Sequence, residues 1–185
     1  MPLTSLFRRH PDAAVLALYA AMVKAARAPV FFAAWQVPDT LDGRFEMIAV
    51  IAFLVLQRLK PAPEAAGFAQ ALHDTMFADF DRNLREMGAS DLGVGRQVKT
   101  MAKSFYGRIR AYERGLAGAE NLDEALHRNL FGTTTPQPAQ IVAAAAYLRR
   151  AAAALETVPV TTLMAGELPA SVFSADDLPP ARSET

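Results

Sequence analysis

The sequence of 185 residues contains no cysteine. This absence excludes disulfide bonds, thiolate zinc sites, iron–sulfur ligation and cysteine nucleophiles. An excess of charge of either sign is also missing, because 19 basic and 19 acidic residues give a formal net charge of zero. No global electrostatic field therefore attracts the chain to nucleic acid or to a membrane, and we expect no DNA partner.

A long uninterrupted apolar segment is missing too. The longest apolar run, residues 47–56, has ten residues, whereas a helix that crosses a bilayer core needs about 20. The N-terminus lacks an apolar run followed by a small-residue cleavage site, so we expect no secretory signal. These patterns predict a cytoplasmic protein, soluble or at most peripheral at the inner membrane, or a protein of the mitochondrial matrix if the source is eukaryotic.

The chain has only three histidines, and no two of them have the four-residue spacing of a helical metal-ligand pair. One histidine lies among acidic residues; the group comprises His73, Asp74, Asp79 and Asp81. A metal-dependent helical hydrolase that uses this group is one alternative. However, at about 100° per residue these side chains spread around a helix instead of sharing one face. We therefore expect no metal, no cofactor and no catalytic residue.

The composition that is present favours a folded helical protein. Hydrophobic residues make up 52% of the chain, which is enough for a sizeable core, and the length is near that of one domain. No strand-like alternation of polar and apolar residues occurs over a useful length. We predict an all-α, compact single-domain bundle of six to eight helices over residues 1–170, followed by a flexible tail at 171–185.

Apolar periodicity and capping residues predict the helices individually. The expected ranges are 13–27, 41–59, 65–87, 90–116, 122–131, 138–157 and 160–168, with one or two further turns within 30–37. The interior of 41–59 is apolar on all sides, so we expect this helix to be buried at the centre. The alanine-rich helix at 138–157 has small side chains, so we expect it to dock weakly.

Helix 90–116 is predicted to be two-faced, with Ser90 or Asp91 as its cap. Its apolar face comprises Val94, Val98, Met101, Phe105, Ile109, Tyr112 and Leu116. The opposite face carries a basic surface of Arg96, Lys99, Lys103, Arg110 and Arg114. This surface is a solvated face, a contact to anionic lipid or ribosomal RNA, or a salt-bridge partner for acidic residues of the preceding helix.

Gly107 interrupts this helix within the tetrapeptide of residues 105–108. A glycine in a helix interior costs about 1 kcal/mol relative to alanine, so such a residue usually permits another backbone to come close. We expect that backbone to belong to a neighbouring helix or to a bound client segment.

Three ordered segments resemble the ubiquinol–cytochrome c chaperone family: DTLDGRFEMIAVIAFLVLQRL, LHDTMFADFDRNLREMG and LREMGASDLGVGRQVKTMAKSFYGRIRAY. The resemblance covers about residues 29–116, and the alanine-rich composition is typical of a bacterial member. It implies a chaperone and not an enzyme, one that binds newly made cytochrome b and supports assembly of the cytochrome bc1 complex (respiratory complex III). The ribosome, an anionic membrane surface and a partner assembly subunit are further partners that it leaves open.

A chaperone for a membrane protein must offer apolar surface of its own, and methionine and aromatic side chains adapt well to such a role. The candidate client-binding residues are Phe31, Phe32, Trp35, Met76, Phe77, Met101, Phe105, Tyr106 and Arg108. The alternative is that most of them belong to the hydrophobic core.

Overall fold

The structure, a computed structural model, describes residues 12–86, 88 and 91–174. These residues form eight α-helices and two short 3-10 helices, with no β-strand among them. In chain order they are α1 Ala13–Ala26, α2 Pro29–Ala33, α3 Leu41–Leu59, η1 Pro63–Ala65, α4 Ala66–Glu86, α5 Asp91–Leu116, α6 Leu122–Leu130, α7 Pro138–Thr157, α8 Val160–Met164 and η2 Ala170–Phe173. The prediction of an all-α bundle of six to eight helices is confirmed.

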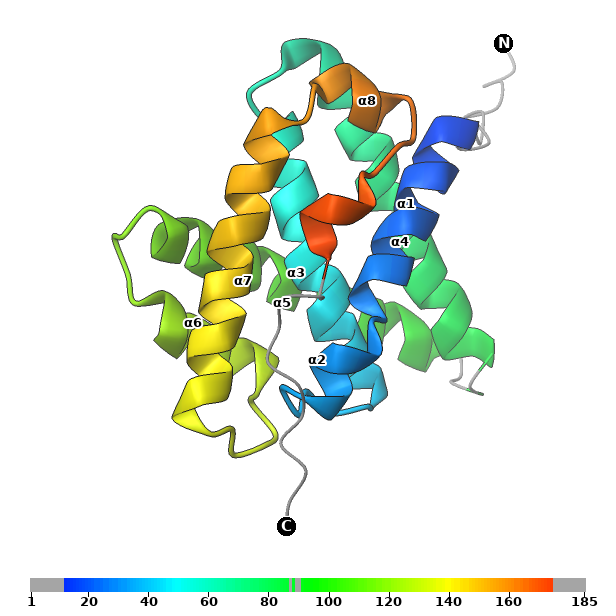
Figure 1. Ribbon diagram of the computed structural model, residues 1–185. Coiled ribbons are helices and arrows are strands. Elements are labelled where there is room, and N and C mark those ends of the chain that lie inside the picture. The colour runs from blue at the N-terminus through cyan, green and yellow to red at the C-terminus, as the bar shows by residue number, and fades with distance from the viewer. Residues whose placement is uncertain (1–11, 87, 89–90, 175–185) are drawn as a thin grey trace, which may run out of the picture.

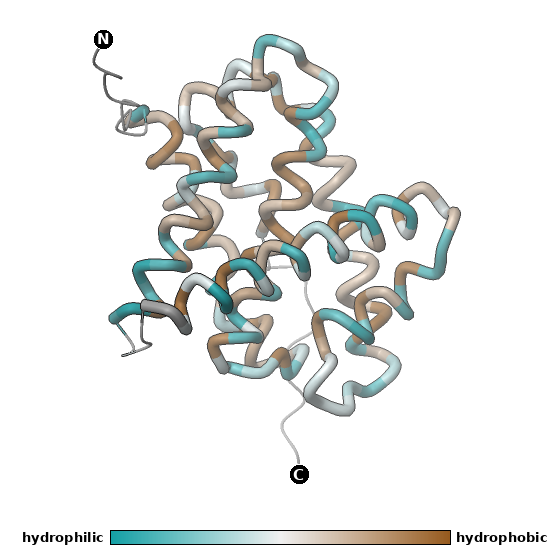
Figure 2. Tube along the Cα trace, turned by 180° about the vertical axis from the view of Figure 1, so that it is seen from behind, coloured by the Kyte–Doolittle hydropathy of each residue, from teal (hydrophilic) through white to brown (hydrophobic). Residues whose placement is uncertain are grey.

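Helix α3 lies at the centre of this bundle, as its uniformly apolar interior predicted. Every residue from 45 to 55 is buried, and α1, α4, α5, α6 and α7 all pack against α3. Figure 1 shows α3 running through the middle, with α6 and α7 on one side and α1 and α4 on the other. Along the outer helices, hydrophobic and hydrophilic residues alternate (Figure 2), because each buries one face only.

Most predicted helix ends are confirmed to within one residue where the chain is described, but the last helix, expected over 160–168, ends at Met164. Asp12 accepts a 3.2 Å hydrogen bond from the backbone N–H of Ala14, and Asn121 accepts one of 2.9 Å from Asp123. Gly88 follows α4 with a φ of +85°, the left-handed conformation that closes helices. The expected cap Ser90 lies outside the described residues.

The segment between α1 and α3 differs in detail from the prediction. The expected short helix forms, but it begins at Pro29, where the missing N–H of proline costs nothing, and it ends at Ala33. The chain then returns across the first turn of α3, so close that a Cβ on Gly43 would lie 1.9 Å from the Pro38 carbonyl oxygen. Glycine is therefore required at this position.

One segment of the described residues, Ala13–Ala33, is apolar and long enough by composition and length to cross a membrane. It comprises α1, a break after Ala26 and α2. In this structure α1 packs on α3 and α4 and buries Val15, Leu18 and Met22 in the core, whereas Leu16 on the same helix is 47% exposed.

Two expectations about the C-terminal third are wrong. Helix α7 does not dock weakly: it packs against α3 and α6, and its buried Ala144, Ala145 and Ala151 let these helices come close. The expected flexible tail begins at 171, yet Val172 and Phe173 are buried, so the packed fold continues to at least residue 173. Residues 175–185 lie outside the described part.

Candidate functional site

Two of the expected client residues lie in a buried aromatic group, which we name the closed cluster: Phe31, Trp35 and Tyr147. The ring centroids of Phe31 and Trp35 are 4.9 Å apart, and each lies 5.3 Å from Tyr147. All three side chains are buried, and burial raises the pKa of the Tyr147 hydroxyl above its ordinary value. The cluster joins α2 and the following loop to α7.

A second aromatic group lies between α4 and α5, and we name it the open cluster: His73, Phe77, Phe105 and Tyr106. The Phe77 ring centroid lies 4.7 Å from His73 and 5.7 Å from Phe105. Phe105 is fully buried, whereas Tyr106 is 56% exposed and His73 and Phe77 are half-buried. The open cluster therefore continues from the core to the surface.

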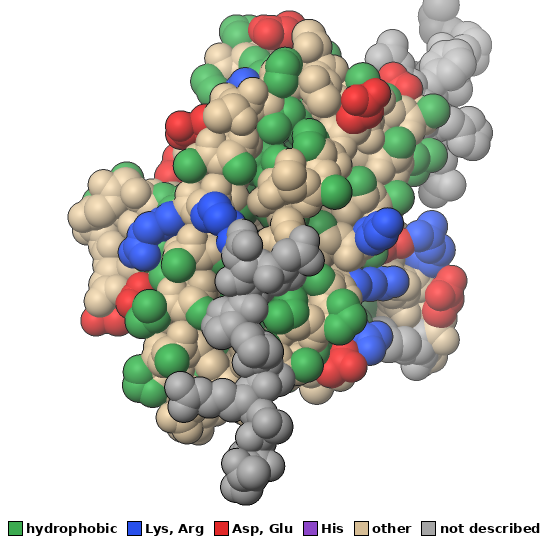
Figure 3. Space-filling model, in the orientation of Figure 1, with side chains coloured by type: hydrophobic (Ala, Val, Ile, Leu, Met, Phe, Trp, Pro, Cys, Tyr) green, Lys and Arg blue, Asp and Glu red, His purple; other side chains and the backbone are tan. Residues whose placement is uncertain are grey.

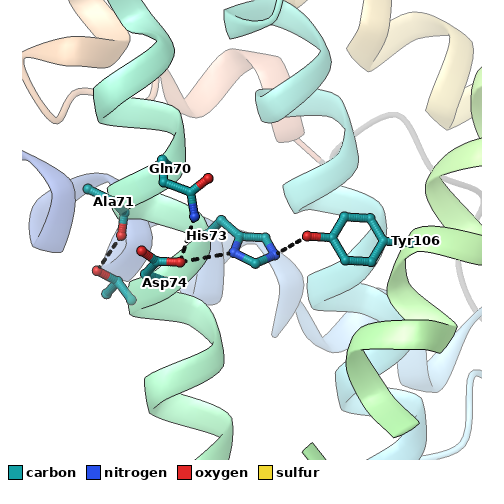
Figure 4. A network of polar contacts seen from close by, with 6 residues as sticks. Gln70, Ala71, His73, Asp74 and Tyr106 are labelled. Carbon is teal, nitrogen blue, oxygen red and sulfur yellow. Dashed lines mark hydrogen bonds and ion pairs between the residues drawn. The ribbon is translucent and has the colours of Figure 1, made fainter. Parts of the chain in front are cut away.

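Polar contacts orient the outer part of the open cluster (Figure 4). His73 Nδ1 lies 3.3 Å from the Asp74 carboxylate, and a 2.9 Å hydrogen bond joins His73 Nε2 to Tyr106 Oη. A carboxylate can only accept, so Nδ1 carries the proton and, in a neutral ring, Nε2 accepts from the Tyr106 hydroxyl. These contacts hold the exposed tyrosine stacked on the histidine ring, at an interplanar angle of 29°.

The remaining predicted client residues do not complete a single groove. Phe31, Trp35, Met76 and Phe105 are buried, because they occupy core-facing positions of their elements, so none of them offers surface in this structure. Phe32 on α2 and Phe77 on α4 are both partly buried against the core. At the α4–α5 contact Phe77 lies beside the exposed Tyr106, so these two are the predicted client residues that come together near the surface.

Met101 and Arg108 line a separate cleft of about 410 Å³. Its walls come from the start of α3, the middle of α5, and the end of α6 with the following loop. At this cleft Arg108 forms a two-pronged ion pair with Glu46 of α3, and its guanidinium lies 5.5 Å from the Phe45 ring centroid. Arg108 is therefore tied to the central helix.

Glu46 is the one buried charged residue of the described chain, 6% exposed. Burial raises the pKa of its carboxyl, and the paired Arg108 opposes that shift. No role for Glu46 was predicted from the sequence. Its position directly before the apolar run 47–56 was the available signal, because a carboxylate that is buried together with such a run needs a partner.

The basic surface of α5 is exposed at all five positions: Arg96, Lys99, Lys103, Arg110 and Arg114. Arg114 pairs with Glu120 at 2.6 Å. The alternative of salt bridges to the acidic residues of α4 finds no support among the described residues, where Asp79 and Asp81 pair with Arg82 and Arg85 of their own helix.

No neighbouring helix approaches Gly107. A Cβ at this position would meet nothing within 4 Å among the described residues, so the close-packing explanation is wrong. The glycine faces outward, beside the exposed Tyr106.

The acidic residues proposed for a hydrolase do not converge. Asp79 accepts a 2.8 Å hydrogen bond from the Tyr19 hydroxyl, and Arg85 Nε donates one of 2.6 Å to Asp81. In the part of the chain that the structure describes, no three His, Asp or Glu side chains form a group that could hold a metal ion. The acids around His73 instead stabilise α4 and its contact with α1.

The described residues thus form an all-α domain that carries an exposed aromatic residue, a cleft and a basic helix face. The model of the ubiquinol-cytochrome C chaperone family matches residues 33–173, and the chain belongs to this family. The match extends well beyond the region 29–116 in which the sequence alone was seen to resemble the family.

Individual relatives agree with this assignment. The chain is 25% identical over 147 residues to the ubiquinol-cytochrome-c reductase complex assembly factor 1 of Xenopus laevis. The aligned region covers 78% of this chain and 74% of that protein. The Drosophila melanogaster counterpart is 24% identical over 70% of this chain and 52% of its own length. The crystal structure of the Cbp3 homolog from Brucella abortus superposes with a TM-score of 0.75 at 37% identity, covering 85% of this chain and 88% of that one.

Proposed function

We propose that this protein is an assembly chaperone that binds newly made cytochrome b during assembly of the cytochrome bc1 complex. Its work would be done in the cytoplasm at the inner membrane surface, or in the mitochondrial matrix for a eukaryotic source. Membership of a family of complex III assembly factors supports the process. The open cluster is the structural feature that supports client binding.

Client binding would be driven by the removal of apolar surface from water. An unassembled membrane-spanning helix exposes apolar side chains, at a cost of about 25 cal/mol per Å², and a chaperone lowers this cost by covering them. The open cluster offers Phe77 and Tyr106 on a rigid two-helix support. Aromatic side chains of this kind contribute much of the energy at protein interfaces.

Site-specific photocrosslinking in cells that express cytochrome b tests the proposal. We expect adducts to cytochrome b from photoreactive residues at positions 77 and 106, and weaker or no adducts from position 32. Position 142 on α7 is the matched control, because Val142 is also exposed and apolar (58% exposed). Equal adducts from 106 and 142, or none from 77 and 106 in a protein that still supports complex assembly, would disprove the proposed site.

A further inference from the structure

The cations of α5 form a straight row. At about 100° and 1.5 Å per residue, Arg96, Lys99, Lys103 and Arg110 lie within about 60° of one another around the helix and extend over about 21 Å. We name these four residues the cationic row. All four are exposed, and they lie on the side of α5 opposite the buried Phe105 and Tyr112.

Acidic residues neutralise only one end of this helix face. Arg114 pairs with Glu120, and Glu113, the acid nearest to Arg110 in the chain, accepts a 2.7 Å hydrogen bond from Lys60. Within the described residues, no ion pair involves Arg96, Lys99 or Lys103. The first half of the row therefore presents charge that no described residue pairs with.

The Lys and Arg side chains on the face drawn in Figure 3 lie over α7, around the lower parts of α1 and α4, and near the top. Lys24 of α1 and Arg27, the C-cap of that helix, are exposed cations outside the row, and they supply a comparison of equal charge.

Two glycines border the row. A Cβ on Gly95 or Gly107 would meet nothing within 4 Å, so the surface is open at both positions. Tyr106 lies at the edge of the row, 56% exposed, with one ring face stacked on His73. A tyrosine at this edge suits the polar boundary of a bilayer, whereas single-stranded RNA stacks successive bases on several aromatic rings, and Tyr106 is the one exposed Phe, Tyr or Trp side chain among the described residues.

We propose that the cationic row is a binding site for anionic phospholipid headgroups and that α5 lies along the membrane surface. Each lysine or arginine close to such a surface contributes about 1 kcal/mol at physiological salt. Because Tyr106 belongs both to the row's edge and to the open cluster, this orientation would place the candidate client surface at the bilayer. The inference goes beyond client binding and does not require it.

Vesicle flotation of the full chain alone, without cytochrome b, tests the site. We expect the protein to float with phosphatidylcholine vesicles that contain phosphatidylglycerol, and not with pure phosphatidylcholine. The double variant Lys99→Gln/Lys103→Gln should bind about 30-fold more weakly, at roughly fivefold per cation. The control Lys24→Gln/Arg27→Gln loses the same net charge from α1 and should bind like the parent.

Each other outcome overturns the proposal. Equal weakening of both double variants would show that charge acts without a site, and failure of the parent to float at low salt would remove the site altogether. Binding to a single-stranded RNA homopolymer in place of the vesicles would assign the row to RNA. Circular dichroism melting of both variants shows that they remain folded, so that loss of binding is not loss of structure.

Discussion

The closed and open clusters contain similar side chains but have different surroundings. Phe31, Trp35 and Tyr147 come from α2, the loop that follows it and α7. Their rings pack on one another, and all three are buried. Phe77 and Tyr106 come from two helices only, and no third element covers the tyrosine. Whether an aromatic side chain belongs to the core or stays accessible to a partner thus depends on whether a further element covers its ring.

The two clusters should therefore respond differently to truncation. Removing a ring from the closed cluster leaves a cavity, whereas removing the exposed ring of the open cluster leaves only solvent. The predictions below run in order of decreasing effect on stability: Trp35→Ala and Tyr106→Ala test that contrast directly, and Arg108→Met tests the ion pair that holds α5 to the central helix.

Trp35→Ala should destabilise the protein by about 3–5 kcal/mol, because the fully enclosed ring leaves a cavity that the surrounding helices fill only in part. Chemical unfolding followed by circular dichroism measures the change. Trp35→Phe is the matched control: it keeps an aromatic ring and removes an indole N–H that is buried without a partner among the described residues. Equal losses for the two variants would show that ring volume is not what the closed cluster contributes.

Arg108→Met should destabilise the protein by about 3 kcal/mol, since it leaves the buried Glu46 carboxylate unpaired. The ion pair joins α3 to α5, the helix that carries half of the open cluster. The exposed pair Lys60–Glu113 is the comparison, and Lys60→Met should cost less than about 1 kcal/mol. Urea unfolding measures the loss of stability in both variants, and equal losses would contradict the prediction.

The Arg108→Met defect should also depend on pH. Without the guanidinium the pKa of Glu46, already raised by burial, rises further, so the folded state holds the proton more tightly than the unfolded state does. Stability then falls as pH rises from the ordinary glutamate range, about 4.3, through the raised value, and the defect is larger at neutral than at acid pH. Glu46→Gln/Arg108→Met should lose this dependence; a double variant as pH-sensitive as the single one would contradict the assignment.

The fold could be predicted from the sequence because the apolar patterns and the helix-capping residues indicated the same helices. The apolar interior of 47–56 required burial, and caps such as Asn121 marked helix starts. The docking strength of α7 was misjudged from side-chain size alone, since alanines that bury little area individually also let whole helices approach. Tyr147, which closes the first cluster, gave no periodic signal that distinguished it from a surface tyrosine.

The candidate site was less predictable than the fold. Periodicity places Phe105 on the apolar face of α5 and leaves Tyr106 off that face, but it does not say how far the neighbouring helices cover Tyr106. The tertiary arrangement leaves this side chain 56% exposed. The pairing of Glu46 with Arg108, 62 positions apart, is likewise a long-range fact, although an acid within an apolar helix predicts that some partner exists.

Tyr106→Ala should change the free energy of unfolding by no more than about 0.5 kcal/mol, the usual range for surface substitutions. Its ring is largely exposed, and the hydrogen bond to His73 can be replaced by one to water. The same variant should reduce recovery of cytochrome b with tagged protein from membrane extracts, at equal amounts of folded chaperone. Val142→Ala removes exposed apolar surface from α7 and should leave both quantities unchanged. If Tyr106→Ala instead destabilises the fold as Trp35→Ala does, the open cluster is part of the core; if it alters neither stability nor recovery, the client binds elsewhere.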